Sequence, residues 1–150
     1  MEIINTSNIN EARKQIQKLK KQDKPIIVRA QDDKFNRKIF ENKDVKMVVG
    51  LEQHDRKDKL KQRDSRLNEV LAKLAKQNNI KIGINIEELK NKNKKDKAII
   101  LSRIIQNIQL CKRTKAQIIL FPEENYKKQD ILGFFLSLKA STQQTFKFFN

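Results

Sequence analysis

The chain has 150 residues, with 34 Lys or Arg against 18 Asp or Glu, which gives a net charge of +16 at pH 7. This length predicts a single domain over residues 1–150, and no run of apolar residues is long enough to cross a bilayer. The N-terminus lacks the layout of a signal peptide, and the single cysteine, Cys111, excludes an intramolecular disulfide framework. We therefore expect a cytoplasmic protein that does not bind membranes, with Cys111 as a buried structural thiol.

The positive charge favours a polyanionic partner. Positive charges in this excess repel one another in the folded chain, and nucleic acid is the commonest partner that relieves the repulsion. Most of the basic residues are Lys, a bias that an A/T-rich genome also produces. Two interpretations follow. The chain binds nucleic acid, or it is a ribosome-associated or general RNA-binding protein whose charge is mainly codon bias.

Short β-branched runs alternate with apolar residues at helical spacing. In chain order they predict strand 3–4, helix 10–22, strand 26–28, helix 32–42, strand 45–49, a helix ending near 77, strand 80–86, helix 96–115, strand 117–121, and helices 129–139 and 142–149. Apolar strands separated by helices are typical of a parallel sheet covered by helices. A complete eight-stranded barrel usually needs about 250 residues, so we expect an α/β fold with four or five strands.

The helix that ends near residue 77 is the most informative element. Its apolar stripe is Leu67, Val70, Leu71 and Leu74. Asp64 and Ser65 are good N-caps, and Asn78–Asn79 can close the helix. Arg63 and Arg66 would then lie at the positive end of the helix dipole, where anions bind well. The alternative is a helix docked on the sheet whose arginines are merely solvated.

Two basic loops, 52–62 and 90–97, follow predicted strands, the second after a short helical turn at 87–89. In a parallel α/β fold both would project from the carboxyl ends of the strands, where ligands usually bind. Each loop alone is more often solvated, but together they favour contact with a phosphate backbone. The RNA-binding candidates from these loops are Arg56, Lys57, Lys59, Lys61, Lys92, Lys94 and Lys95.

The helix over 96–115 carries a ridge of Ile100, Ile104, Ile108 and Cys111, with polar residues beside it. Arg103 and Asn107 are one turn apart and could jointly bind a phosphate or a carboxylate. An ion pair between Arg103 and Glu87 or Glu88 is an equal alternative.

Residues with catalytic chemistry are sparse. The only histidine, His54, lies between Glu52 and Asp55, without a second histidine or a cysteine partner, so a solvated or RNA-contacting role is favoured over a metal ligand. No glycine-rich phosphate loop is present. The acid pairs at 32–33 and 123–124 are better explained by a helix N-cap and a loop. A small metal-dependent nuclease or phosphoesterase using Glu52, His54, Asp55 and Asp64 remains the enzyme alternative.

Four segments, which agree with the family in order and spacing, resemble archaeal ribonuclease P protein component 3, the relative of the thirty-kilodalton subunit of the eukaryotic enzyme. They are RDSRLNEVLAKLA at 63–75, IKIGIN at 80–85, SRIIQNIQLCK at 102–112 and AQIIL at 116–120. The resemblance covers over a third of the chain. Its matching positions include Arg63, Asp64, Ser65, Asn68, Arg103 and Asn107.

The resemblance implies a TIM-barrel-like fold, binding to ribonuclease P RNA, pairing with the component 2 protein, and a part in removing 5′ leaders from precursor tRNA. The RNA subunit, with bound Mg²⁺, would perform the hydrolysis, so no catalytic side chain, metal or cofactor is expected on this chain. Arg63 and Arg103 would contact RNA, and Asp64, Ser65 and Asn68 would cap or support the structure.

The chain departs from the family in three respects. It is shorter than typical members, the acidic motif of the N-terminal strand is not recognisable, and Phe121–Pro122 replaces the small polar residues usual after the strand. We therefore expect a reduced barrel whose sheet can be incomplete and completed by a partner subunit.

Overall fold

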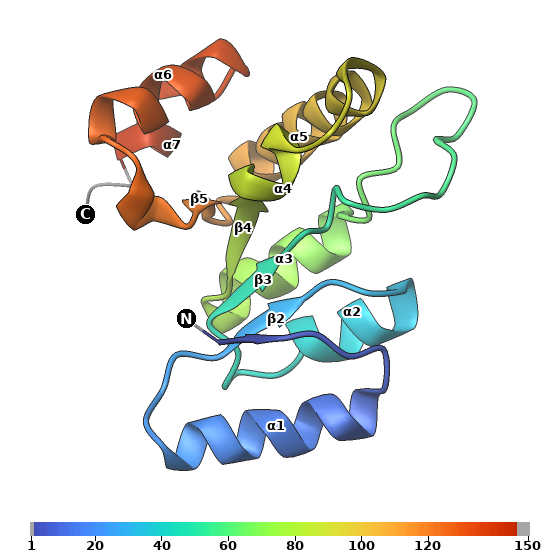
Figure 1. Ribbon diagram of the computed structural model, residues 1–150, viewed down its shortest axis with the longest axis vertical. Helices are drawn as coiled ribbons and strands as arrows, with labels where there is room; N and C mark the ends of the chain where they lie inside the picture. Colours follow the sequence, from blue (N-terminus) through green and yellow to red (C-terminus); the bar gives the residue numbers. More distant parts are fainter. Residues whose placement is uncertain (1, 147–150) are drawn as a thin grey trace.

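The computed structural model describes residues 2–146. Its five strands form one parallel sheet in the order β1-β2-β3-β4-β5 (Figure 1). The strands are β1 (Ile3–Ile4), β2 (Ile27–Arg29), β3 (Met47–Val49), β4 (Lys81–Asn85) and β5 (Ile118–Phe121). Each predicted strand is present, and the α/β class with a parallel sheet is confirmed.

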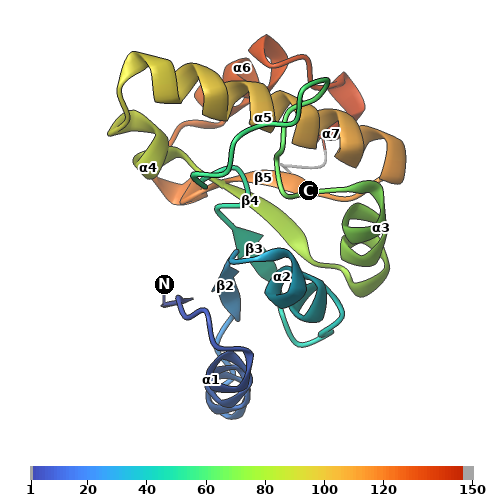
Figure 2. The ribbon, with the colours of Figure 1, turned by 90° about the vertical axis from the view of Figure 1, so that its right-hand side faces the viewer.

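The first five helices lie between consecutive strands, as the alternating pattern predicted, and the last three follow β5. They are α1 (Ile9–Lys21), α2 (Asp33–Phe40), α3 (Glu69–Asn78), α4 (Ile86–Lys90), α5 (Lys94–Thr114), the 3₁₀ helix η1 (Glu123–Asn125), α6 (Lys128–Ser137) and α7 (Thr142–Phe146). Seen from the side, α2 and α3 cover the same face of the sheet (Figure 2). The helix predicted over 142–149 is present to residue 146, and the remainder lies outside the described residues.

One hydrophobic core fills the space between the sheet and its helices. The strand register places Ile4, Val28, Val48, Ile82 and Ile118 in one row across all five strands, and all are buried. Side chains at alternate strand positions share a face, which explains this single row. The helix residues predicted to face inward join the same core, among them Ala12, Ile16, Ile39, Ile104 and Ile108.

The opposite face of the sheet carries a smaller cluster of Ile27, Val49 and Phe121. Gly83 lies in β4 beside this cluster. A Cβ atom there would stand 2.7 Å from Val49 Cγ1 and 2.8 Å from Met47 Sδ, so glycine is needed for close approach of the neighbouring side chains.

The sheet is open, with β1 and β5 as its edges. Sequential parallel strands with intervening helices are the arrangement of a (βα) barrel, and the described residues supply five strands without closure. This agrees with the expected reduced barrel-like fold. None of the helices between residues 2 and 146 has the length and apolar character needed to cross a membrane.

Three details of the prediction are wrong. Helix α3 begins at Glu69, with Asn68 as its N-cap, so neither Asp64 nor Ser65 caps it. Val70, placed on the apolar stripe, is 53% exposed, whereas Leu71 is buried. The second loop is shorter than expected, because α5 already begins at Lys94. The closing residue is correct, since Asn79 adopts the left-handed conformation that ends α3.

A candidate nucleic-acid interface at the carboxyl ends of the strands

The segment from Gly50 to Asn68, here called the β3–α3 loop, is the most prominent irregular feature. It starts at Gly50, whose φ of 77° favours glycine, and it projects from the sheet beside the start of α5 (Figures 1 and 2). A single bridge between Lys59 and Gln62 narrows its tip, where Leu60 is fully exposed. A long loop of this kind has a defined shape only if internal contacts hold it.

Arg103 of α5 supplies the central contact. Its Nη1 donates to the carbonyl oxygens of Glu52 (3.1 Å) and His54 (3.0 Å), and its Nη2 donates to that of Arg56 (2.9 Å). Its Nε pairs with Asp58 at 3.2 Å. The guanidinium donors thus fix every second residue of the loop from Glu52 to Asp58.

The position of Arg103 differs from the prediction. The sequence placed Arg103 and Asn107 on a polar helix face, as surface contacts. Arg103 is only 4% exposed and Asn107 is fully buried, so both lie in the interior. The acid that pairs with Arg103 is Asp58, not Glu87 or Glu88. Arg103 therefore positions the loop from beneath.

Asp58 is the acidic centre of the loop. Its carboxylate accepts the Asp64 backbone N–H (2.8 Å) and pairs with Arg63 (3.0 Å) as well as with Arg103. Desolvation opposes ionisation, but these donors together hold the pKa of Asp58 at about 2. Asp58 therefore stays charged at any pH where the protein is expected to work.

Arg56 joins the loop to helix α2. Its two Nη atoms pair with Asp33 and Asp64, each at 2.9 Å. This explains why Asp64 does not cap α3: its carboxylate also accepts the backbone N–H of Arg66 at 3.2 Å. The Ser65 side chain is buried, with its hydroxyl donating to the Leu67 carbonyl at 3.4 Å. Of the three predicted structural residues, Asn68 alone caps, accepting the Leu71 N–H at 2.9 Å.

His54 closes the base of the loop. Its Nε2–H donates to the Asp64 carbonyl, and its Nδ1 accepts the Arg56 backbone N–H at 3.1 Å, so both ring nitrogens are occupied. Desolvation, with the charges of Arg103 and Arg66, lowers the pKa of His54. The neutral ring is the form that this pair of bonds requires, since a protonated Nδ1 could not accept.

The residues of the nuclease alternative do not converge. Glu52 is completely buried, Asp55 is exposed, and His54 and Asp64 are engaged as described. Within residues 2–146, no cluster of three or more His, Cys, Asp or Glu side chains is arranged to hold a metal ion. The acid pairs have the expected roles in structure, with Asp32 capping α2 and Glu123 and Glu124 in η1.

Glu52 lies under the loop, beside an ion pair between Arg29 and Glu88. Burial raises the pKa of Glu52 to about 7, and the nearby charge of Glu88 adds to the effect, whereas the backbone N–H groups of Glu52 and Asn85 and the charge of Arg29 oppose it. Cys111, also buried as predicted, has a pKa raised to about 12 by desolvation, so its thiol stays protonated.

Exposed cations from both predicted basic loops line a common cleft. A cleft of about 550 Å³ separates the β3–α3 loop from the start of α5, and its walls include Lys57 and Lys92. Of the predicted RNA contacts, Arg103 and Asn107 are buried and Arg56 and Arg66 are partly buried. The other seven are exposed, namely Lys57, Lys59, Lys61, Arg63, Lys92, Lys94 and Lys95. The six lysines in this group make no ion pair with any described residue.

Sequence reasoning missed Asp58 and missed the ion pair of Asp33 with Arg56, having assigned the acid pair at 32–33 to a helix N-cap. Asp58 is one of several acids in a lysine-rich stretch, and nothing local distinguishes it from Asp55. Its partner Arg103 lies 45 residues away, so its role depends on the tertiary fold.

Comparisons with known proteins show what the chain as a whole is similar to. The chain is 27% identical to ribonuclease P protein component 3 of Methanococcus maripaludis strain C7 over 117 residues, which is 78% of this chain and 47% of that protein. It is 30% identical to the Methanococcus vannielii protein of the same name over 129 residues, or 85% of this chain and 51% of that one. No protein-family model matches the chain.

The fold is also similar to a chain in the cryo-EM structure of an archaeal ribonuclease P with mature tRNA. The TM-score is 0.72 at 22% identity, and the match covers 92% of this chain and 59% of that chain. This chain thus spans about half the length of the curated relatives that it matches. The chain is thus similar in sequence to ribonuclease P protein component 3 over most of its own length, and its fold is similar to that of a chain in an archaeal ribonuclease P.

Proposed function

We propose that the chain is a protein subunit of ribonuclease P that binds and stabilises the RNA subunit during removal of the 5′ leader from precursor tRNA. The proposal is supported by the similarity to component 3 and by a net charge of +16. The RNA subunit, with its bound Mg²⁺, would supply the hydrolytic chemistry. The component 2 protein would be the protein partner, and precursor tRNA would be contacted indirectly.

The observation that carries this proposal is the internal order of the β3–α3 loop. Arg103, Asp58 and His54 hold its main chain, while Lys57, Lys59 and Lys61 point into solvent. A loop that is ordered before binding loses less conformational entropy when it meets its partner. Lysines without acidic partners are available to neutralise phosphates and release counterions.

The direct test is to purify the protein from its native cells at low salt and sequence the RNA that accompanies it. Strong enrichment of ribonuclease P RNA is expected. Recovery of ribosomal and transfer RNA in proportion to their abundance would instead favour a general RNA-binding protein. Cleavage of RNA by the purified protein alone with Mg²⁺ or Mn²⁺, lost on His54→Ala, would favour the nuclease.

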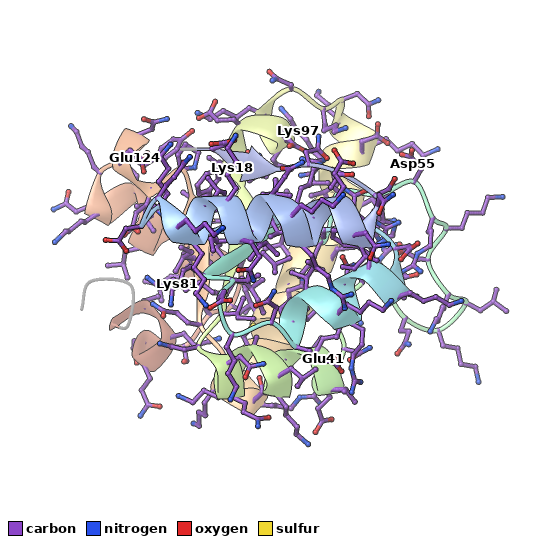
Figure 3. The ribbon with its side chains drawn as sticks, turned by 90° about the horizontal axis from the view of Figure 1, so that it is seen from below. Lys18, Glu41, Asp55, Lys81, Lys97 and Glu124 are labelled. Carbon is purple, nitrogen blue, oxygen red and sulfur yellow. The ribbon has the colours of Figure 1, made fainter. Side chains whose placement is uncertain are left out.

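The loop lysines are expected to carry the salt dependence of binding. Replacing Lys57, Lys59 and Lys61 together with alanine should lower the slope of log affinity against log salt by roughly 2 to 3, since each phosphate contact contributes about 0.7 to 0.9. The matched control replaces Lys14, Lys18 and Lys21, which are exposed on α1 (Figure 3 labels Lys18). Filter binding to ribonuclease P RNA at several salt concentrations measures both. If the two triple variants have equal slopes, RNA binding depends on the total positive charge of the protein and not on the position of the lysines.

A further inference from the structure

The backbone of Arg66 has an unusual conformation within the β3–α3 loop. Its φ is 60°, in the left-handed region that side chains disfavour. The other non-glycine residues with positive φ between residues 2 and 146 are Asp23, Asn79, Lys115 and Lys139. Each of these follows the end of a helix, where the left-handed conformation is common. Arg66 alone lies ahead of a helix, within the β3–α3 loop.

The Arg66 side chain is also without a partner. Arg56, Arg63 and Arg103 each form ion pairs, whereas the guanidinium of Arg66 makes no ion pair or hydrogen bond with a described residue. The side chain is partly buried, and its Nε is enclosed without an acceptor. Burial and the charge of Arg56 both lower the pKa of Arg66. The fold therefore holds a desolvated cation in a strained conformation, as functional sites often do.

A cavity of about 170 Å³ lies beside this guanidinium. Its cationic lining consists of Arg56, Lys59, Arg63 and Arg66. Asp33 and Asp64 also line it, but both carboxylates are bound to Arg56, and Asp64 additionally accepts the Arg66 backbone N–H. Arg56 is occupied by these two acids and Arg63 by Asp58, so Lys59 and Arg66 are the cations of the lining that form no ion pair with a described residue, and the cavity is positive. Asp64 thus fixes the Arg66 backbone in its left-handed conformation and leaves the side chain free.

We propose that this cavity is a seat for one phosphate group of an RNA backbone, with Arg66 as its principal ligand. A guanidinium presents parallel N–H donors that match two phosphate oxygens, and the guanidinium of Arg66 has no partner among the described residues. Arg66 lines the cavity while its backbone is held in the left-handed conformation. The inference rests on the proposed RNA-binding function and adds to it a discrete contact, distinct from the diffuse field of the loop lysines.

The test replaces Arg66 with glycine, which removes the cation and also relieves the backbone. We expect affinity for ribonuclease P RNA to fall about tenfold and the salt slope to fall by about 1, because one charged contact is lost. The melting temperature should stay level or rise by up to about 3 °C, because glycine adopts this φ freely. Arg66→Lys, which keeps the charge but loses the planar fork, should give an intermediate affinity.

Lys115→Gly is the matched control. Lys115 is likewise a cation at positive φ (64°), but it is the C-cap of α5 and is not part of the β3–α3 loop. Its replacement removes the same charge and relieves the same kind of strain. We expect a similar effect on the melting temperature and less than about a twofold change in RNA affinity. Equal RNA affinity of the Arg66→Gly and Lys115→Gly proteins would overturn the proposal.

A second measurement separates the seat from the ribonuclease P assignment. Titration of the protein alone with inorganic phosphate should shift the Arg66 Nε–Hε resonance saturably, and the amide shifts of neighbouring residues should disappear in Arg66→Gly. A saturable shift in a protein that does not bind ribonuclease P RNA would support the seat and contradict the proposed function. The absence of any saturable shift would overturn the seat, whatever the RNA affinity.

Discussion

Replacing Arg103 with alanine is expected to weaken both the fold and RNA binding, although the side chain is almost inaccessible. The substitution removes the donors for the carbonyls of Glu52, His54 and Arg56 and leaves Asp58 without its buried partner. Breaking a buried ion pair in this way typically costs about 3–5 kcal/mol of unfolding free energy. Chemical denaturation should show a loss of this order.

The functional part of the effect should exceed what lost stability explains. Once released, the loop must be ordered again on binding, so we expect the affinity for ribonuclease P RNA to fall by roughly tenfold or more. Ile108→Ala is the control, because Ile108 is fully buried on the same helix and its truncation costs a similar 2–5 kcal/mol. The folded Ile108→Ala protein should bind RNA normally.

Arg103→Lys separates charge from geometry. Lysine can pair with Asp58, but a single ammonium cannot serve three carbonyls and the carboxylate with the spacing of a guanidinium. We expect partial recovery of stability and less recovery of affinity. If Arg103→Ala and Ile108→Ala bind RNA equally well, Arg103 is a packing residue and the ordered loop does not govern binding.

The sheet and most of the helices could be predicted from the sequence because neighbouring residues determine where each of them forms. Runs such as Ile118 to Phe121 are apolar throughout, as strands covered on both faces must be. The ridge of Ile104 and Ile108 follows helical spacing, and Asp32 caps α2 through its own side chain. Each of these features depends on residues within one or two turns.

The organisation of the site depended on contacts that leave no local pattern. Arg103 is buried because main-chain carbonyls from 47 to 51 residues away converge on it, and carbonyls carry no residue identity. Asp64 is a good cap by local rules, but its ion pair with Arg56 and its bond to the Arg66 N–H take precedence. The basic loops could be placed at one edge from topology alone, whereas the order within them could not.

Replacing Glu52 with glutamine is expected to stabilise the protein above neutral pH. Glu52 is fully buried, and its pKa is raised from 4.5 to about 7. Between these values the folded chain keeps a proton that the unfolded chain releases. The stability contributed by the neutral carboxyl is therefore complete below pH 4.5 and is lost as the pH rises through 7. A shift of this size corresponds to about 3 kcal/mol.

The two proteins should thus be equally stable near pH 4, and Glu52→Gln should be more stable by about 3 kcal/mol at pH 8. Chemical denaturation at both pH values measures the difference in unfolding free energy between the two proteins. The titration of other groups, including His54, is common to both proteins and cancels in this difference. Glu124→Gln, which removes a charge from the exposed helix η1, is the control and should show no such gain. A Glu52→Gln difference that does not change with pH would mean that Glu52 is not desolvated in the folded protein.

The Glu52→Gln substitution also tests whether this buried carboxyl affects the order of the β3–α3 loop. The Glu52 carbonyl is one of the acceptors that Arg103 uses to hold the β3–α3 loop, so a charge forced onto the Glu52 side chain at high pH acts directly beneath that contact. We expect amides of residues 52–58 to exchange with solvent faster in the wild type than in Glu52→Gln at pH 8, once intrinsic exchange rates are taken into account. If the amides are equally protected from exchange in the two proteins, Glu52 affects only the global stability, and Arg103 determines the order of the loop.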